Sequence, residues 1–366
     1  MTSSAIPSDA LAHVGSTPPR PAPPLAKPTL VHVLLGDLLS VVLTVITIAL
    51  LVALLPRLID WAVLSGHWSG DGAACRDGGA CWAFLREKGR QIVFGIYPPN
   101  QHWRPAGAVA LIVVLALWTL PPRNWTRRTL ALWIGGLVAV LGLMRGGALG
   151  LTEVPTAAWG GLPVTLLLTV VSLGVGFPLA VLLALGRRSG LKGISLLSVG
   201  VIETVRGLPL LSLLFIASIL LPIMLPDGLS VDKLARAMVA LTIFSAAYLA
   251  EVLRGGLQGV PTAQGEAAQA LGLSWLQTTR LIVLPQAIRK VIPPLTNTVI
   301  VMVKNTSLVL VVGLFDLLSS GRAAATDPAW PSPYSETYLF VGMIYFLICF
   351  GISRYSRWLE QRTSQA

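Results

Sequence analysis

Long apolar stretches without a charged side chain are the dominant pattern along this sequence. The clearest of them cover residues 38–56, 154–186 and 207–226. At 1.5 Å per residue, a helix of each length can cross the roughly 30 Å hydrocarbon core of a bilayer. Backbone polar groups in lipid must be satisfied within the segment, and the alternation typical of outer-membrane strands is absent, so we expect helices.

The pattern predicts an all-α polytopic membrane protein with about eight transmembrane helices. Composition agrees, because 54% of the 366 residues are hydrophobic and only 12% are charged, whereas soluble domains carry about 25% charged residues. We expect the helices at 33–57, 104–121, 129–148, 160–186, 196–225, 236–257, 288–314 and 337–354.

The distribution of arginine and lysine predicts the orientation. With the N-terminus in the cytoplasm, most basic residues fall on the inner side, among them Arg123, Arg187, Arg289 and Arg354. This is the arrangement that the positive-inside rule favours. The outer segment 60–103 also carries basic residues, but loops of that length are weakly governed by the rule. The net charge of +11 therefore reflects topology, and we expect no nucleic-acid partner.

Composition and loop length divide the chain into four parts. A Pro-, Ala- and Ser-rich start lacks the features of a signal peptide and is expected to be disordered. The parts are a cytoplasmic tail 1–32, a three-helix N-terminal extension 33–157 with the outer loop 60–103, a five-helix core 158–357 with a cytoplasmic loop 258–286, and a cytoplasmic tail 358–366.

Two cysteines lie in the outer loop, where an oxidising compartment would permit a disulfide. Cys75 and Cys81 either form that bond or remain two free thiols. A metal site is not expected, because only His67 and His102 are nearby.

The cytoplasmic insert 266–285, "EAAQALGLSWLQTTRLIVLP", is amphipathic and too polar to span a bilayer. Its first residues are strong helix formers, Gly272 suits a helix end, and Ser274 is a candidate N-cap for a second helix. Pro285 is expected to end that second helix. Such an elbow is either a docking surface for a partner or an amphipathic segment lying on lipid.

The insert resembles the EAA-loop signature of ABC importer permeases at every defined position: Glu266, Ala267, Ala268, Gly272, Ile282, Leu284 and Pro285. Flanking stretches such as "ETVRGLPLL" and "VKNTSLVLVVGLFDLL" are similar to the polar amino-acid permeases of the histidine, glutamate, glutamine, arginine and opine group. The outer loop and "SRYSRWLEQR" look closest to the general L-amino acid permease subfamily. Two departures are Ala263-Gln264-Gly265 before the signature, and Asn305 where the family more often has an acid.

The resemblance implies a type I importer permease in the bacterial inner membrane, coupled to a separate ATPase subunit through the EAA loop. Gly272 would let the loop bend, Ala267 and Ala268 would allow close approach, and Glu266 would offer a charge. It further implies a periplasmic amino-acid-binding protein and a second, homologous permease chain in a heterodimer, all in contact with membrane lipid. Substrate would cross from periplasm to cytoplasm by alternating access, with ATP and Mg used by the ATPase.

Lys304, with Asn305, Thr306 and Ser307, makes a polar patch in an otherwise apolar span. A lysine at that depth costs roughly 2.5–3.5 kcal/mol on insertion scales unless it meets water or a partner. Its ammonium either meets the carboxylate of an amino acid in transit, or snorkels or pairs between helices.

Two acid–base pairs lie at predicted cytoplasmic helix ends, Glu203 with Arg206 and Glu251 with Arg254. Each has the spacing of a local ion pair along a helix. In the family such positions also frame the cytoplasmic gate. Each pair is therefore either a local ion pair or part of that gate.

Sequence motifs for bond chemistry are absent. There is no G-x-x-x-x-G-K-[ST], no H-E-x-x-H and no G-x-S-x-G, so we expect neither catalytic residues nor a cofactor bound by this chain. The alternative to an ABC permease is a secondary amino-acid transporter driven by an ion gradient, which would need buried acidic residues in its spans. A membrane scaffold protein is a third reading.

Overall fold

A computed structural model describes residues 30–148, 150–226 and 230–364. The predicted tail 1–32 and the end of the predicted tail 358–366 lie largely outside the described residues. Within the described part the chain is helical, and the only β pairing is an isolated bridge between His67 and Cys81. The prediction of an all-α protein is confirmed.

Contacts divide the chain into two compact units, Met1–Asp60 and Trp61–Ala366. The first unit contains α1 (Leu30–Leu35) and α2 (Leu38–Ile59). The side chain of Asp37 accepts a hydrogen bond from the Ser40 N–H and so caps α2. A π-helical turn, Asp60–Leu64, follows α2 in the sequence.

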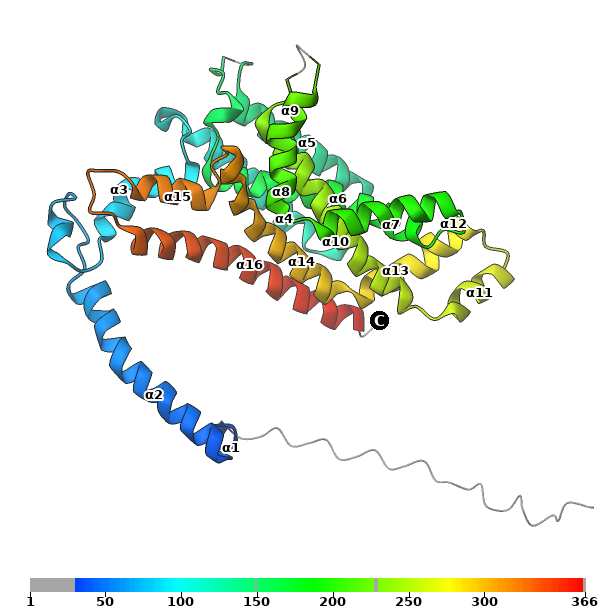
Figure 1. The fold of residues 1–366 in the computed structure, drawn as a ribbon, viewed down its shortest axis with the longest axis horizontal. Coiled ribbons are helices and arrows are strands. Elements are labelled where there is room, and N and C mark those ends of the chain that lie inside the picture. The colour runs from blue at the N-terminus through cyan, green and yellow to red at the C-terminus, as the bar shows by residue number, and fades with distance from the viewer. Residues whose placement is uncertain (1–29, 149, 227–229, 365–366) are drawn as a thin grey trace, which may run out of the picture. The chain divides into compact units, whose positions relative to one another are not determined.

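The second unit begins with the outer segment and continues through all the remaining helices (Figure 1). The outer segment holds a 3₁₀ turn (Ala74–Asp77), α3 (Trp82–Phe94) and a second 3₁₀ turn (Pro99–Gln101). After it come α4 (Trp103–Thr119), α5 (Arg127–Arg145), α6 (Gly161–Arg187), α7 (Lys192–Gly207), α8 (Leu210–Phe215), α9 (Leu221–Met224), α10 (Lys233–Gln258), α11 (Thr262–Ala270), α12 (Trp275–Gln277), α13 (Leu284–Lys290), α14 (Ile292–Asn305), α15 (Leu317–Ala325) and α16 (Tyr334–Ser364).

Within the described residues, six helical segments are long and apolar enough to cross a membrane: Leu38–Leu64, Arg127–Arg145, Gly161–Arg187, Lys233–Gln258, Ile292–Val312 and Tyr334–Arg362. A seventh span exists if the bent pair Lys192–Gly207 and Leu210–Met224 is counted as one. The predicted helix 104–121 corresponds to α4, whose 17 residues are at the short end of what a transmembrane helix needs.

Two of the predicted helices were wrong as single straight segments. The expected helix 196–225 is α7 followed by α8 and α9, with a bend of 104° between the two halves. The break falls at Leu208 and Pro209 because proline has no N–H to donate and forces the preceding residue out of the helical region.

The expected helix 288–314 is interrupted as well. α13 ends at Lys290, Val291 leaves the helical conformation with a ψ of 14°, and α14 starts at Ile292. After Asn305 the chain tightens into a 3₁₀ helix, Thr306–Val312. Lys304 therefore lies in the last turn of α14, rather than in the middle of one long helix.

The core of the second unit is built around α6 and α10. The Ser245 hydroxyl of α10 donates to the Ser172 carbonyl of α6 at 2.7 Å. A Cβ added at Gly176 would lie 2.4 Å from the Ser245 Oγ, so a larger residue there would displace this hydroxyl from its hydrogen bond. Small residues at such a contact let two backbones approach closely, which is how helices associate in lipid.

The outer segment packs onto the helices of the predicted core. Cys75 and Cys81 are joined in a disulfide beside the buried ring of Phe84, which meets the Trp330 ring edge-on at 5.5 Å. The Cys81 N–H donates to the buried Glu336 carboxylate of α16 at 2.7 Å. The segment 61–157, predicted as part of an extension, thus belongs to the same compact unit as the core.

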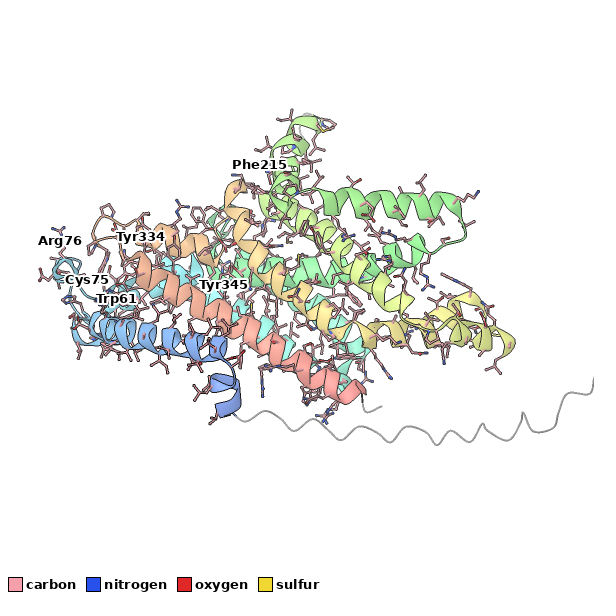
Figure 2. All side chains as sticks on the ribbon, turned by 60° about the horizontal axis from the view of Figure 1, so that its bottom comes forward. Trp61, Cys75, Arg76, Phe215, Tyr334 and Tyr345 are labelled. Carbon is pink, nitrogen blue, oxygen red and sulfur yellow. A yellow bond between two sulfur atoms is a disulfide. The ribbon has the colours of Figure 1, made fainter. Side chains whose placement is uncertain are left out.

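Figure 2 shows the ends of the second unit with side chains. Cys75 and Arg76 lie at the end where α16 begins with Tyr334, and Tyr345 lies further along α16.

An ion pair connects α3 to the segment before α16: Lys88 of α3 pairs with Asp327 at 2.6 Å. This hydrogen bond raises the pKa of Lys88 and lowers the pKa of Asp327, so both groups are held in their charged forms.

Candidate coupling surface and translocation path

The elbow of the EAA loop is formed by a glycine in the left-handed region. α11 ends at Ala270, and Gly272 follows with a φ of +80°. The Gly272 N–H donates to the Gln269 carbonyl and the Leu273 N–H to the Ala268 carbonyl. This pair of bonds is a Schellman motif, so the predicted helix end at Gly272 is confirmed.

The second arm of the elbow begins with a capping box. The Ser274 hydroxyl accepts from the Gln277 N–H, and the Gln277 side chain accepts from the Ser274 N–H at 2.8 Å. The predicted N-cap at Ser274 is confirmed. The prediction for Pro285 was wrong: it lies in the first turn of α13, where the missing N–H is tolerated, and it starts a helix instead of ending one.

Large apolar side chains of the elbow face outward. Leu271 is 83% exposed, and Trp275, Leu276 and Leu281 are each more than 60% exposed. Leu271 follows α11, Trp275 and Leu276 lie in α12, and Leu281 lies in the π-helical turn Thr278–Val283. We call these four exposed side chains the apolar patch, and no other described element covers them. Exposed apolar patches mark surfaces that bind a partner or a membrane.

The signature residues divide between the outer and inner sides of this elbow. Glu266, Ala267, Gly272 and Pro285 are exposed, whereas Ile282 and Leu284 are half-buried. Ala268 is 4% exposed and lies where α11 packs on the π-helical turn Thr278–Val283. The two arms are thus packed on each other, which lets the elbow move as one body.

The two predicted acid–base pairs belong to one network. Arg254 donates from Nε to both oxygens of Glu251 at 3.0 Å, and Arg206 lies 3.8 Å from Glu203. Arg206 also reaches Glu251 at 3.5 Å, so the pair on α7 is connected to the pair on α10.

Sequence reasoning missed Arg187, the residue that completes this network. Its guanidinium contacts Glu203 at 2.7 Å and Glu251 at 3.5 Å, which joins the end of α6 to α7 and α10. These partners are 16 and 64 residues away in the sequence, so no local spacing signals the contact. The network lies close to the point where α10 leads into α11 and the elbow.

Lys304 is exposed at the end of α14 and lines a cavity of about 220 Å³ with Ser307, Tyr338 and Tyr345. Among the ion pairs of the described residues, none includes Lys304. The hydroxyl of Ser307 donates to the Lys304 carbonyl at 2.8 Å.

The other polar residues of the predicted patch point elsewhere. Thr306 is buried, and its hydroxyl donates to the Val303 carbonyl at 2.8 Å. Asn305 is half-buried and contacts the Met302 sulfur. Neither side chain lines the cavity, whereas Lys304 and Ser307 do.

A buried carboxylate near this cavity was also missed from the sequence. Asp316 is fully buried and caps α15 by accepting from the N–H groups of Leu318 and Ser319. Tyr345 of α16 donates its hydroxyl to Asp316 at 2.9 Å. Asp316 therefore fixes the start of α15 against α16, and its only sequence signal is the N-cap position before an apolar helix.

Comparison with known proteins decides the family. Residues 176–365 match the binding-protein-dependent transport system inner membrane component family. This chain belongs to that family. It is 44% identical over 315 residues to the inner membrane amino-acid ABC transporter permease protein YhdY of Escherichia coli strain K12, with 84% of each chain aligned.

Two further relatives show which parts are shared. The chain is 37% identical to the glutamate/glutamine/aspartate/asparagine transport system permease protein BztC of Rhodobacter capsulatus, with 82% of each chain aligned. It is 34% identical to the probable glutamine ABC transporter permease protein GlnP of Bacillus subtilis, over 56% of this chain and 92% of that one. The shorter relative thus lacks a counterpart for much of this chain, whereas YhdY and BztC match most of it.

These findings confirm the resemblance to amino-acid ABC permeases drawn from the EAA loop and its flanks. The chain is a multi-pass component of an inner-membrane importer, and the family's systems depend on a binding protein. The ion-gradient-driven transporter is not favoured.

Proposed function

We propose that this chain is the permease subunit of an ATP-driven importer for L-amino acids, which moves its substrate from the periplasm to the cytoplasm. The observation that carries the proposal is the elbow 262–290. It combines the complete EAA signature with an apolar patch at Leu271, Trp275, Leu276 and Leu281 that is open to a partner. The substrate class is inferred from YhdY and BztC, whose names specify amino-acid transport.

In this proposal the elbow inserts into a separate ATPase subunit, which binds ATP and Mg. Closure of the ATPase pulls on α11. The pull passes to α10 because only a short turn, which ends at Pro261, separates the two helices. The network of Arg187, Glu203, Arg206, Glu251 and Arg254 then acts as a cytoplasmic gate, joining α10 to α6 and α7. A periplasmic binding protein delivers the substrate, and a second, homologous permease chain completes the path as a heterodimer. The chain itself performs no bond chemistry.

The test is uptake in proteoliposomes that contain the permease chains and the ATPase, with binding protein outside and ATP inside. Uptake of labelled L-amino acids should require both ATP and the ATPase. The double variant Leu271→Ser/Leu276→Ser should lose ATPase binding and uptake, because it removes apolar area from the patch. The control Ala263→Ser/Ala270→Ser adds the same hydroxyls at exposed positions of α11 and should keep both. Uptake by this chain alone under a proton or sodium gradient would overturn the proposal.

We further propose that the Lys304 ammonium meets the carboxylate of the amino acid in transit. Its exposure, the adjoining cavity and the tyrosine hydroxyls beside it support this role. Lys304→Met should reduce uptake at least tenfold, on the basis that a charge-assisted hydrogen bond contributes about 1.5–3 kcal/mol. Lys304→Arg should retain part of it. Normal uptake by an assembled Lys304→Met complex would contradict this role and favour a lysine that only positions helices.

A further inference from the structure

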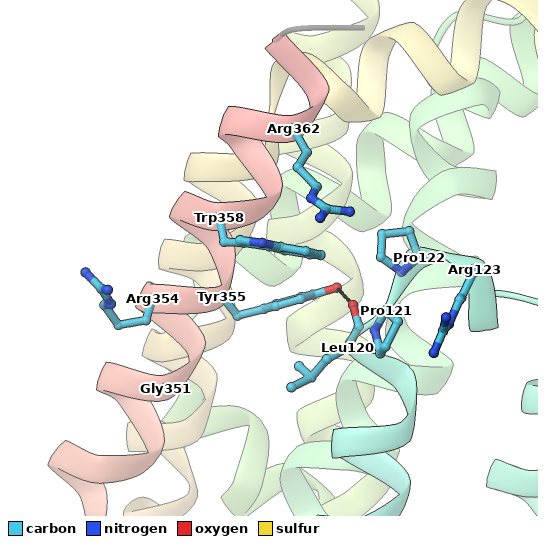
Figure 3. A pocket seen from close by; sticks show the side chains of 9 residues that line it. All are labelled: Leu120, Pro121, Pro122, Arg123, Gly351, Arg354, Tyr355, Trp358 and Arg362. Atoms are coloured by element: carbon cyan, nitrogen blue, oxygen red, sulfur yellow. Dashed lines mark hydrogen bonds between the residues drawn. The ribbon is translucent and has the colours of Figure 1, made fainter.

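A groove at one end of the second unit combines an apolar floor with arginines. It has a volume of about 660 Å³ and lies between the turn after α4 and the last turns of α16. Leu120 and Pro121 contribute from the turn, and Tyr355 from α16 (Figure 3). The Tyr355 hydroxyl donates to the Leu120 carbonyl at 2.7 Å, which fixes the two walls of the groove relative to each other.

Three arginines line the groove from these two elements, and in Figure 3 the Arg354 side chain points to the side of α16 away from Leu120. Arg123 comes from the turn, and Arg354 and Arg362 come from α16. The Arg362 guanidinium lies 4.5 Å from the centre of the Trp358 ring, which in turn stacks on Tyr355 at 5.6 Å. Arg362 is therefore held over the groove by an aromatic face.

Among the described residues, no acidic side chain lines the groove. Among the ion pairs between described residues, none includes Arg123, Arg354 or Arg362. The described lining of the groove thus carries positive charge only, and its occupant should be anionic.

The depth of the groove in the membrane follows from helix length. α16 has 31 residues, about 46 Å at 1.5 Å per residue, and the hydrocarbon core takes up about 20 of them. Counted from Tyr334, the remaining residues begin near Arg354. The apolar floor at Leu120 and Gly351 therefore faces the end of the hydrocarbon, and the arginines face the headgroup layer.

We propose that this groove binds one anionic phospholipid, with its phosphate held by Arg123 and Arg362 and reached by the exposed Arg354 after a change of rotamer, and with its acyl chain lying along Leu120 and Gly351. Arginine is suited to phosphate because its guanidinium presents several donors in a planar fork. Basic pockets between helices on the cytoplasmic side recognise anionic headgroups in this way. Scattered interfacial arginines would meet headgroups without preference, and the difference here is that three of them share one concave site. The proposal depends on the chain lying in a membrane, and not on the substrate it carries.

The test is native mass spectrometry of the full-length chain in detergent, titrated with phosphatidylglycerol or with phosphatidylcholine of the same acyl chains. We expect one phosphatidylglycerol to bind in preference to phosphatidylcholine. The variant Arg123→Gln/Arg354→Gln/Arg362→Gln should lose about 100-fold in affinity, since each basic residue near an anionic surface contributes about fivefold. The control Arg127→Gln/Arg128→Gln/Arg357→Gln removes the same charge from the start of α5 and from α16, at exposed positions outside the groove, and should bind as the unaltered chain does.

Equal losses in the two triple variants would overturn the proposal, as would equal binding of the two lipids. Inorganic phosphate at millimolar concentration should not displace the lipid, and complete displacement would show that the site takes free phosphate. A photoreactive phosphatidylglycerol gives a readout that needs no variant, and it should label residues 120–123 and 351–362 in the unaltered protein. Labelling that avoids these residues in the assembled importer would show that a partner subunit fills the groove, and would also overturn the proposal.

Discussion

At Gly272 one backbone conformation determines the direction of the elbow. Its φ of +80° is unfavourable for other residues, although an added Cβ would meet no atom within 4 Å. The cost of a substitution is therefore conformational and not steric. Gly272→Val should destabilise the elbow by about 1–3 kcal/mol, because a β-branched residue is strongly disfavoured in the left-handed region. If the elbow couples ATP use to transport, ATP-driven uptake should fall up to about 100-fold.

The matched control at the same position is Gly272→Asn. Asparagine adopts the left-handed conformation more readily than other non-glycine residues, so this variant should keep most of the uptake. Both variants should insert in the membrane in equal amounts, because the position is exposed and outside the spans. Equal uptake by the valine and asparagine variants would mean that the elbow geometry is not required.

Arg104 is a buried charge that serves the end of another helix. It is 1% exposed, and its guanidinium donates to the carbonyls of Leu143 at 2.7 Å, Met144 at 3.0 Å and Thr152 at 2.9 Å. A cation at the C-terminus of α5 satisfies carbonyls that have no partner within the helix and is favoured by the helix dipole. In the sequence this arginine is only the first residue of the predicted helix 104–121, and the contacts across 39 to 48 residues explain why its role was not predicted.

Arg104→Met should lower the free energy of unfolding by about 3 kcal/mol, since each hydrogen bond from a charged donor contributes about 1.5–3 kcal/mol. The matched control is Arg145→Met at the same helix end. Arg145 is mostly exposed and pairs with the exposed Glu153 at 3.1 Å, so its loss should cost less than about 1 kcal/mol. The measurement is the thermal unfolding midpoint of the purified chain in detergent. Equal midpoints for the two variants would contradict the assigned role of Arg104.

At the scale of elements, Glu251 holds three helices together. It is contacted by Arg187 of α6, Arg206 of α7 and Arg254 of its own helix. Glu251→Gln would leave three arginines near one another without this acid and should destabilise the chain by about 1–3 kcal/mol. Glu203→Gln should cost less, because the side chain of Glu203 is 51% exposed and that of Glu251 is 23% exposed.

A double-mutant cycle tests whether α6 and α10 are coupled through this network. Arg187→Gln, Glu251→Gln and the double variant should show a coupling energy of about 0.5 kcal/mol or more. If the network is also the gate, the single variants should change the rate of uptake more than the amount of assembled complex. A coupling energy near zero would reduce the network to separate local pairs.

The elements that the sequence predicted well are those specified by local chemistry. Apolar runs located the spans, Gly272 the end of α11, and Ser274 the start of α12, because each signal lies within a few residues of its effect. Pro209 and Pro285 were harder, since proline is compatible with a bend, a helix end or a first turn, and packing decides among them. Arg187 and Asp316 were missed because their partners are distant in the sequence.

At the scale of the whole molecule, the two predicted functional ends are separated by the length of the long helices. The outer segment with its disulfide packs where α16 begins, and α6 extends 27 residues from Gly161 to the charge network at Arg187. That length is about 40 Å at 1.5 Å per residue, enough to cross the bilayer. Figure 1 shows α3 and α15 at one end of this unit and α11 and α12 at the other.

This separation predicts opposite accessibility for two exposed positions, Arg86 on α3 and Leu271 on the elbow. In a Cys349→Ala background, Arg86→Cys should react with a membrane-impermeant maleimide added to intact spheroplasts. Leu271→Cys should react only after the membrane is permeabilised, because the basic residues near the elbow favour the cytoplasmic side. The disulfide between Cys75 and Cys81 leaves no thiol there to label. The reverse pattern would place the elbow outside, where it could not meet an ATPase, and labelling of both positions in intact spheroplasts would contradict the proposed path of α6 and α10 across the membrane.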